Sequence, residues 1–147
     1  MRVRPGFASA AVLVLVATAG GMLLSAGTVK GADEKPYKVE NDNHVDKGTY
    51  NGYRRYGDAC LRCHGPDGAG SSYAPDLTDS LKHLSKEQFE DVVINGRQNV
   101  STSSDKVMPA FGTTEDVVNY LDDIYSYLKA RSDGVLGRGR PTRIGED

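Results

Sequence analysis

Two cysteines and a histidine stand together near the middle of the chain, in the order Cys60-Leu61-Arg62-Cys63-His64. Residues three apart share one face of a helix, so both thiols can reach the two vinyl groups on one edge of a porphyrin and form thioethers with them. The residue that follows, His64, is then held beneath the iron and can serve as its proximal ligand. This spacing predicts one covalently attached c-type haem.

Cys60 and Cys63 could instead form a structural or redox-active disulfide, or half of a zinc site. The sequence contains only two cysteines, so the thiols that would complete a zinc ribbon are missing. No strand is expected before Cys60, and neither alternative requires a histidine directly after the second cysteine. The covalent haem is therefore the preferred interpretation.

The sixth ligand of the iron decides the class of function. An iron held only by His64 can bind gases or peroxide, whereas an iron closed by a second protein ligand mainly transfers electrons. Met108 is the only methionine outside the N-terminal leader, and it stands beside Pro109 on a loop between two predicted helices. It is the expected sixth ligand, with His83 as the main alternative and His44 as a weaker one.

The residues around the motif predict the elements that position it. A first helix is expected from about Thr49 to Cys60, followed by a loop over residues 65–84 beneath the haem. A carbonyl in the segment that begins at Pro75 is expected to accept the proton on Nδ1 of His64.

Two further helices are expected after this loop. Ser85 to Gln88 form a capping box that opens a short helix, in which Phe89 faces either the haem or ordinary core. A last helix after Thr113 carries an apolar stripe: Val117, Leu121, Ile124 and Leu128.

The first 32 residues indicate export. Two arginines, Arg2 and Arg4, precede a run without charge from Pro5 to Val29, and small residues follow, which is the order of a secretory signal peptide. The alternative is an uncleaved membrane anchor, because a run of this length could span a bilayer. In both cases the haem domain is expected in the periplasm, and it contacts a membrane only if the leader is retained.

The rest of the chain is expected to hold one small domain. Residues 33–46 are a predicted loose lead-in, residues 47–133 the haem domain, and residues 134–147 a flexible tail rich in Gly and Arg. Without the leader, 15 basic and 20 acidic residues remain, a net charge of −5. This balance disfavours nucleic acid and anionic membrane surfaces as partners.

The chain resembles the class I c-type cytochromes over about residues 47–131. The residues that carry the resemblance are Gly52, Tyr56, Cys60, Cys63, His64, Pro75, Met108 and the stretch 124–128. The resemblance implies an all-α fold of three to four short helices around one haem. It also implies that Gly52 and Tyr56 of the first helix cross the stretch 124–128 of the last one.

Four shorter stretches resemble, more narrowly, periplasmic cytochromes linked to methanol metabolism. They are residues 48–56, 63–68, 108–112 and 136–141. Such cytochromes act beside quinoprotein alcohol dehydrogenases. The resemblance implies an electron-transfer protein, not an enzyme, that receives single electrons from such a dehydrogenase and passes them to a terminal oxidase or another cytochrome. The alternative is a haem-c gas sensor or a peroxidase-like enzyme with an open distal site.

Overall fold

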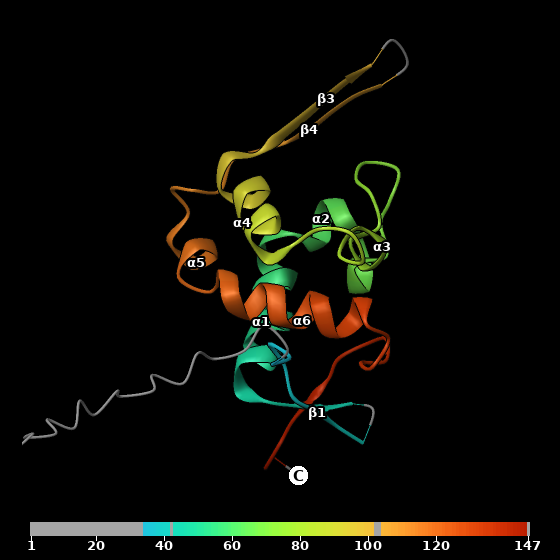
Figure 1. The fold of residues 1–147 in the computed structure, drawn as a ribbon, viewed down its shortest axis with the longest axis vertical. Helices are drawn as coiled ribbons and strands as arrows, with labels where there is room; N and C mark the ends of the chain where they lie inside the picture. The colour runs from blue at the N-terminus through green and yellow to red at the C-terminus, as the bar shows by residue number, and fades with distance from the viewer. Residues whose placement is uncertain (1–33, 42, 102–103, 147) are drawn as a thin grey trace, which may run out of the picture. The chain divides into compact units, whose positions relative to one another are not determined.

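The computed structural model describes residues 34–41, 43–101 and 104–146, and the predicted leader lies outside them. The described residues belong to one compact unit, Asp33–Asp147. Its core is helical, as expected for the class I cytochrome fold (Figure 1). The helices are α1 (Lys47–Ala59), α2 (Leu61–His64), the 3₁₀ turn η1 (Pro66–Gly68), α3 (Leu77–Ser80), α4 (Lys86–Asn95), α5 (Glu115–Val118) and α6 (Leu121–Ser132). No described helix has the length and apolar character needed to cross a membrane.

The centre of the fold is the crossing of α1 and α6, which lie against each other (Figure 1). Gly52 of α1 is buried at this crossing, where an added Cβ would lie 1.8 Å from the carbonyl oxygen of Asp123. Only glycine permits two backbones to come this close. Tyr56, one turn later, packs against Tyr127 with 5.6 Å between the ring centroids and 51° between the ring planes. The predicted contact between Gly52, Tyr56 and the last helix is therefore present.

The apolar stripe predicted for the last helix is confirmed as core. All four of its residues are buried: Val117, Leu121, Ile124 and Leu128. The helix itself is interrupted at Asn119 and Tyr120, so that the stripe runs over α5 and α6. Arg55 of α1 braces this turn, since its guanidinium lies 4.3 Å from the centre of the Tyr120 ring and 3.3 Å from a carboxylate oxygen of Asp116.

The first helix begins earlier than expected, because Asp46 caps it. The Asp46 carboxylate accepts hydrogen bonds from the backbone N–H of Thr49 at 3.0 Å and from its hydroxyl at 2.6 Å. A carboxylate at this position satisfies amides that the first helical turn leaves without partners. Thr49, the predicted start of the helix, is instead fully buried inside the first turn.

The polar segment before Met108 is a hairpin, where the sequence predicted an irregular loop. Strands β3 (Arg97–Ser101) and β4 (Ser104–Met108) pair antiparallel, with Arg97 opposite Met108, and the hairpin projects away from the helices in Figure 1. At its base, successive side chains are exposed on both strands, at Arg97, Gln98, Lys106 and Val107. The hairpin is attached to a core made of helices, so the predicted fold class, an all-α cytochrome fold, still describes the core.

The two ends of the domain also differ from the prediction. A three-stranded sheet joins β1 (Val39–Glu40), β2 (His44–Val45) and β5 (Thr142–Arg143), and β2 runs parallel to β5. Val45 and Leu136 are buried members of the core cluster. The predicted loose lead-in 33–46 and flexible tail 134–147 are thus packed in the described part, because their few apolar residues fill gaps at the end of the helical core.

Candidate haem-binding site

The two cysteines lie where α1 passes into α2. The Cys60 N–H donates to the Tyr56 carbonyl, and the Cys60 carbonyl accepts hydrogen bonds from the N–H groups of Cys63 at 3.1 Å and His64 at 2.9 Å. These bonds keep the segment in helical turns, which places the two thiols one turn apart. Cys60 is half-buried and Cys63 is exposed, so the pair spans the boundary between the interior and the surface.

The chain turns sharply after His64, at Gly65. This residue has φ of +71°, and a Cβ added to it would lie 2.4 Å from the carbonyl oxygen of Gly70. Tyr56 fixes the same turn from α1, since its buried hydroxyl donates to the Gly65 carbonyl and accepts the Gly68 N–H. Burial raises the pKa of Tyr56 to about 12, so the hydroxyl stays a donor at neutral pH.

His64 is buried, and its ring is held by the contact that the sequence predicted. The distance from its Nδ1 to the carbonyl oxygen of Pro75 is 3.0 Å. A carbonyl can only accept, so the proton lies on Nδ1 and the lone pair lies on Nε2. The imidazole is therefore in the tautomer that a metal ligand requires, with its orientation fixed by the second nitrogen.

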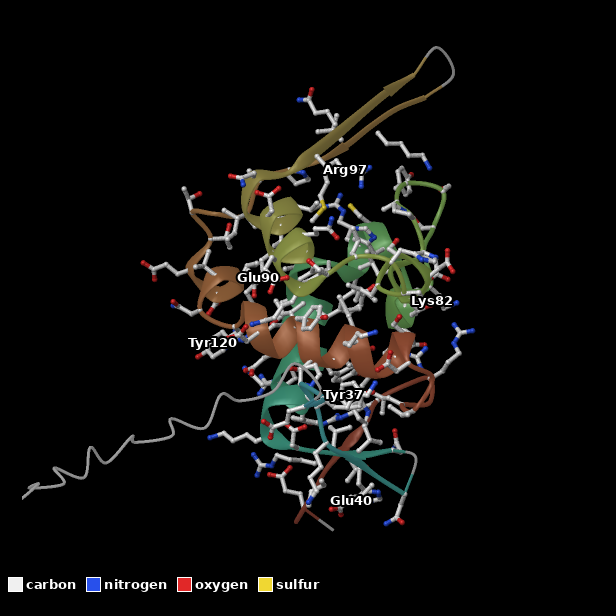
Figure 2. The ribbon with its side chains drawn as sticks, in the orientation of Figure 1. Tyr37, Glu40, Lys82, Glu90, Arg97 and Tyr120 are labelled. Atoms are coloured by element: carbon white, nitrogen blue, oxygen red, sulfur yellow. The ribbon has the colours of Figure 1, made fainter. Side chains whose placement is uncertain are left out.

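Met108 is the last residue of β4, and the segment that follows it is anchored to α4. The N–H groups of Phe111 and Gly112 each donate, at 3.0 Å, to the carbonyls of Val93 and Ile94. These carbonyls lie in the last turn of α4, where a helix leaves acceptors without partners. Met108 is half-buried against the core cluster. Arg97, which pairs with Met108, is labelled in Figure 2 at the base of the hairpin.

The alternative ligands lie in different surroundings. His83 is exposed on the connection between α3 and α4. His44 is part of β2, where it stands opposite Thr142 in the sheet that joins the two ends of the domain. Phe89 is buried and packs on Tyr125 with 5.4 Å between ring centroids, so at least part of its role is ordinary core packing.

The cysteine environment does not fit the alternatives to haem. Burial raises the pKa of the Cys60 thiol to about 11, whereas redox-active Cys-x-x-Cys pairs have a lowered thiol pKa. Both cysteines are free thiols. Within the described ranges, no group of three or more His, Cys, Asp or Glu side chains is arranged to hold a metal ion, as a zinc site would need.

One positioning residue was missed by the sequence analysis. Asp67 lies in η1, three residues after His64, and its carboxylate accepts the Nε–H of Arg138 at 3.1 Å and the N–H of Gly139 at 3.0 Å. Asp67 has φ of +61°, a conformation that Asp tolerates better than most residues. The C-terminal segment is thereby tied to the loop below His64. An acidic residue in a Pro-Asp-Gly turn, together with tail arginines, was the available signal.

The residues present fit a covalently bound haem. Two adjacent thiols, an imidazole with Nε2 available and a half-buried thioether provide the donor set of such a group. The set contains no oxygen donor, so it does not suit a hard cation such as Mg²⁺ or Ca²⁺.

Comparison with known proteins agrees with this donor set. Residues 49–128 match the family described as cytochrome C oxidase, cbb3-type, subunit III. Cytochrome c-553I of Paracoccus denitrificans is 48% identical over 111 residues, which are 76% of this chain and 49% of that protein. The chain thus spans about half the length of this relative. Cytochrome c-555 of Methylococcus capsulatus is 44% identical over 96 residues, 65% of this chain and 72% of that protein.

A solved structure shows the same fold. The crystal structure of the c-type cytochrome XoxG from Methylobacterium extorquens AM1 matches with a TM-score of 0.61 and 41% identity, over 80% of this chain and 77% of the other. The family match covers more than half of the sequence and includes the Cys-x-x-Cys-His motif. The chain therefore belongs to the class I c-type cytochromes, the small helical electron carriers with a covalently attached haem c.

Proposed function

We propose that the chain is a periplasmic monohaem electron carrier, exported by its N-terminal leader, and that it performs no bond chemistry on a substrate. The observation that carries the proposal is the buried imidazole of His64, held by the Pro75 carbonyl directly after the paired thiols. Cys60 and Cys63 would bind the haem as thioethers, and His64 would ligate the iron through Nε2. The bound haem supplies one-electron redox chemistry.

Met108 is the proposed second iron ligand. Its position at the end of β4, half-buried against the core and anchored to α4, supports this role. The exposed position of His83 and the place of His44 in the terminal sheet favour neither histidine. A thioether opposite an imidazole raises the reduction potential of the iron and closes the site to exogenous ligands.

The protein's part in electron transfer is to hold these ligands without rearrangement. Tyr56 fixes the turn after His64, the Pro75 carbonyl fixes the imidazole, and α4 fixes the segment that bears Met108. Ligands held by a packed scaffold do not have to move when the charge of the iron changes. This rigidity suits a carrier that gains and loses one electron repeatedly.

A quinoprotein alcohol dehydrogenase is the proposed electron donor, with a terminal oxidase or another cytochrome as acceptor. Two observations support this assignment. Four stretches of the chain resemble cytochromes linked to methanol metabolism. Two of the relatives come from Methylococcus capsulatus and Methylobacterium extorquens.

Carbon monoxide tests the proposal against a gas sensor or a peroxidase-like enzyme. A six-coordinate carrier is expected to leave its reduced spectrum unchanged under carbon monoxide at neutral pH. Rapid formation of a carbon monoxide adduct by the native protein would favour an open distal site and overturn the carrier assignment.

Two further experiments test the covalent attachment and the donor. The haem is expected to stay with the polypeptide in acid acetone, and Cys60→Ser should leave one thioether. Reduction by a purified quinoprotein alcohol dehydrogenase with its alcohol substrate then tests the donor separately.

A further inference from the structure

Two adjoining cavities lie along the side of α1, next to the segment that carries the paired cysteines. Their volumes are about 370 and 350 Å³, and both are lined by Tyr53, Arg54 and Arg140. The first extends past Asp67 towards Leu61, and the second extends to Tyr50. We call them together the α1 groove. Neither cavity is lined by the two cysteines, His64 or Met108.

The C-terminal segment builds the second wall of the α1 groove. It runs beside the start of α1, and it is held there by the contacts of Asp67 with Arg138 and Gly139 (Figure 1). Arg140 follows directly and donates to the Tyr50 hydroxyl at 2.7 Å. The groove is thus a consequence of the packed tail, which is why the sequence did not indicate it.

The α1 groove presents two cations without carboxylate partners. Arg138 pairs with Asp67, and Arg143 pairs with Glu146. Arg54 and Arg140, by contrast, form no ion pair within the part of the chain that the structure describes, and both are exposed. Their guanidinium groups therefore keep free donors for an acidic ligand, although the exposed carboxylate of Asp58 also lines the first cavity.

The floor of the α1 groove is formed by the half-buried rings of Tyr50 and Tyr53, which are backed by the buried rings of Tyr127 and Tyr56. The ring centroids of Tyr50 and Tyr53 are 6.3 Å apart, those of Tyr53 and Tyr127 are 5.6 Å apart, and Tyr127 continues to Tyr56. Rings that are already packed lose little freedom on binding. Tyr and Arg are also the residue types that dominate binding energy at protein interfaces.

We infer that the α1 groove docks an acidic segment of the electron donor, with carboxylates paired to Arg54 and Arg140 and an apolar side chain on the tyrosine floor. This inference rests on the proposed function, because the donor is taken to be the proposed dehydrogenase. The exposure of both arginines favours a segment of a protein over a small molecule, since small-molecule sites bury most of their ligand. Leu61, which lies between the two cysteines in the sequence, lines the first cavity, so a segment docked here lies beside the haem-attachment segment of the chain.

Electron-transfer kinetics test the inference with matched charge changes. The double variant Arg54→Gln/Arg140→Gln removes two positive charges from the α1 groove, and Lys47→Glu removes the same net charge from an exposed site outside it. With the holo-protein at low salt, the double variant should be reduced by the dehydrogenase about tenfold more slowly, and the difference should shrink as salt is added. Lys47→Glu should change the rate less than twofold, and reduction by ascorbate should be equal in all three proteins. Equal losses in both variants, or no loss, would overturn the docking role.

A peptide titration separates this inference from the proposed function. The probe is the synthetic peptide Glu-Glu-Tyr-Glu-Glu, titrated into the ¹⁵N-labelled holo-protein. Amide shifts are expected at residues 50–57 and 139–140 in the wild type and in Lys47→Glu, and they should be absent in the double variant. If the peptide shows this binding pattern but the dehydrogenase does not reduce the protein, the donor assignment fails. The α1 groove then remains a docking site for an acidic segment. If the peptide causes no amide shifts in the wild type, the inference is overturned. It is also overturned if the amides of residues 50–57 and 139–140 shift with protein concentration in the absence of peptide, because that would indicate that a second copy of the chain binds the groove.

Discussion

Gly52 and Asp123 bring the backbones of α1 and α6 into direct contact, since a Cβ on Gly52 would stand 1.8 Å from the Asp123 carbonyl oxygen. No side-chain movement can relieve such an overlap, because the opposing atom is backbone. The crossing holds Tyr56 above the turn that follows His64. The packing of two helices thereby sets the geometry of the haem-binding loop.

Gly52→Ala should therefore destabilise the holo-protein, by about 1 to 3 kcal/mol or more, as expected for overpacking at a tight interface. Gly57→Ala is the matched control, because Gly57 lies in the same helix and a Cβ there meets nothing within 4 Å. That change should raise the free energy of unfolding by about 0.5 to 1 kcal/mol. Urea denaturation followed by circular dichroism measures both. Similar values for the two variants would mean that the helices do not cross at Gly52.

Tyr56→Phe and Tyr127→Phe should have different effects, although both rings are buried. Removing the Tyr56 hydroxyl leaves the Gly65 carbonyl and the Gly68 N–H without their partner, at a cost of about 1 to 3 kcal/mol. The Tyr127 hydroxyl has no hydrogen-bond partner among the described residues. Its removal should leave the free energy of unfolding unchanged or raise it by up to about 1 kcal/mol. The pair is compared by chemical denaturation at pH 7, and a larger loss for Tyr127→Phe would contradict the assigned contacts.

Leu136→Ala tests whether the C-terminal segment belongs to the core. Leu136 is 2% exposed, and its carbonyl accepts the Nη1–H of Arg131 at 2.7 Å. Truncation should lower the free energy of unfolding by about 2 to 4 kcal/mol, the usual range for a buried Leu. Val135→Ala, at a neighbouring residue that is 42% exposed, should change it by no more than about 0.5 kcal/mol. A mobile tail would make both changes neutral.

Asp133 should contribute to the acid dependence of stability. Burial alone would raise the pKa of its carboxyl, but hydrogen bonds from Lys129 at 2.6 Å, Lys35 at 2.7 Å and Tyr37 at 2.6 Å outweigh burial and hold the pKa well below its usual 3.8. A carboxyl with a lowered folded-state pKa stabilises the fold above its unfolded-state pKa, near pH 4, and this contribution disappears as the pH falls below that value.

The expected result is that Asp133→Asn lowers stability at pH 7 and flattens its decline below about pH 4. Asp58→Asn, which alters an exposed carboxyl on α1, is the control. Urea unfolding of the holo-protein at a series of pH values gives the comparison. Parallel curves for Asp133→Asn and the wild type below pH 4 would show that the contacts of Asp133 do not persist in solution.

Met108→Ala should open the iron to carbon monoxide and lower the reduction potential, by on the order of 100 mV within the ~0.8 V range that axial ligands span. The sulfur-to-iron charge-transfer band should disappear in the same variant. His83→Ala should leave the potential and the spectrum as in the wild type. The opposite outcome, with Met108→Ala silent and His83→Ala altered, would transfer the role of sixth ligand to His83.

The sequence indicated features that depend on local spacing. The Cys-x-x-Cys-His order is one example, and the capping box is another, since the Ser85 hydroxyl accepts the Gln88 N–H and the Gln88 side chain accepts the Ser85 N–H. The contact of His64 with Pro75 was also predicted. The roles of these residues in binding haem remain predictions.

Features that depend on distant partners were not predictable from local patterns. The two-residue strands β2 and β5 are too short to carry a periodic signal, and β5 is a strand only through its pairing with β2, which lies near the other end of the domain. The Tyr56 hydroxyl acts on a loop that only the α1–α6 crossing brings near. Asp67 and Arg138 form a hydrogen bond although they are 71 residues apart in the sequence. The hairpin before Met108 gave no strand signal, because successive residues such as Lys106 and Val107 are both exposed and show no alternation of apolar and polar residues.

The parallel pairing of β2 with β5 has a consequence for the order of events in folding. β2 pairs with its sequence neighbour β1, but its pairing with β5 joins residues 44–45 to residues 142–143 and therefore closes a loop of almost the whole domain. Contacts between such distant residues also form slowly. The contacts of Asp67 with Arg138 and Gly139 likewise join residues that are 71 and 72 positions apart. The turn below His64 is therefore expected to be locked late in folding, after the contacts between neighbouring residues have formed.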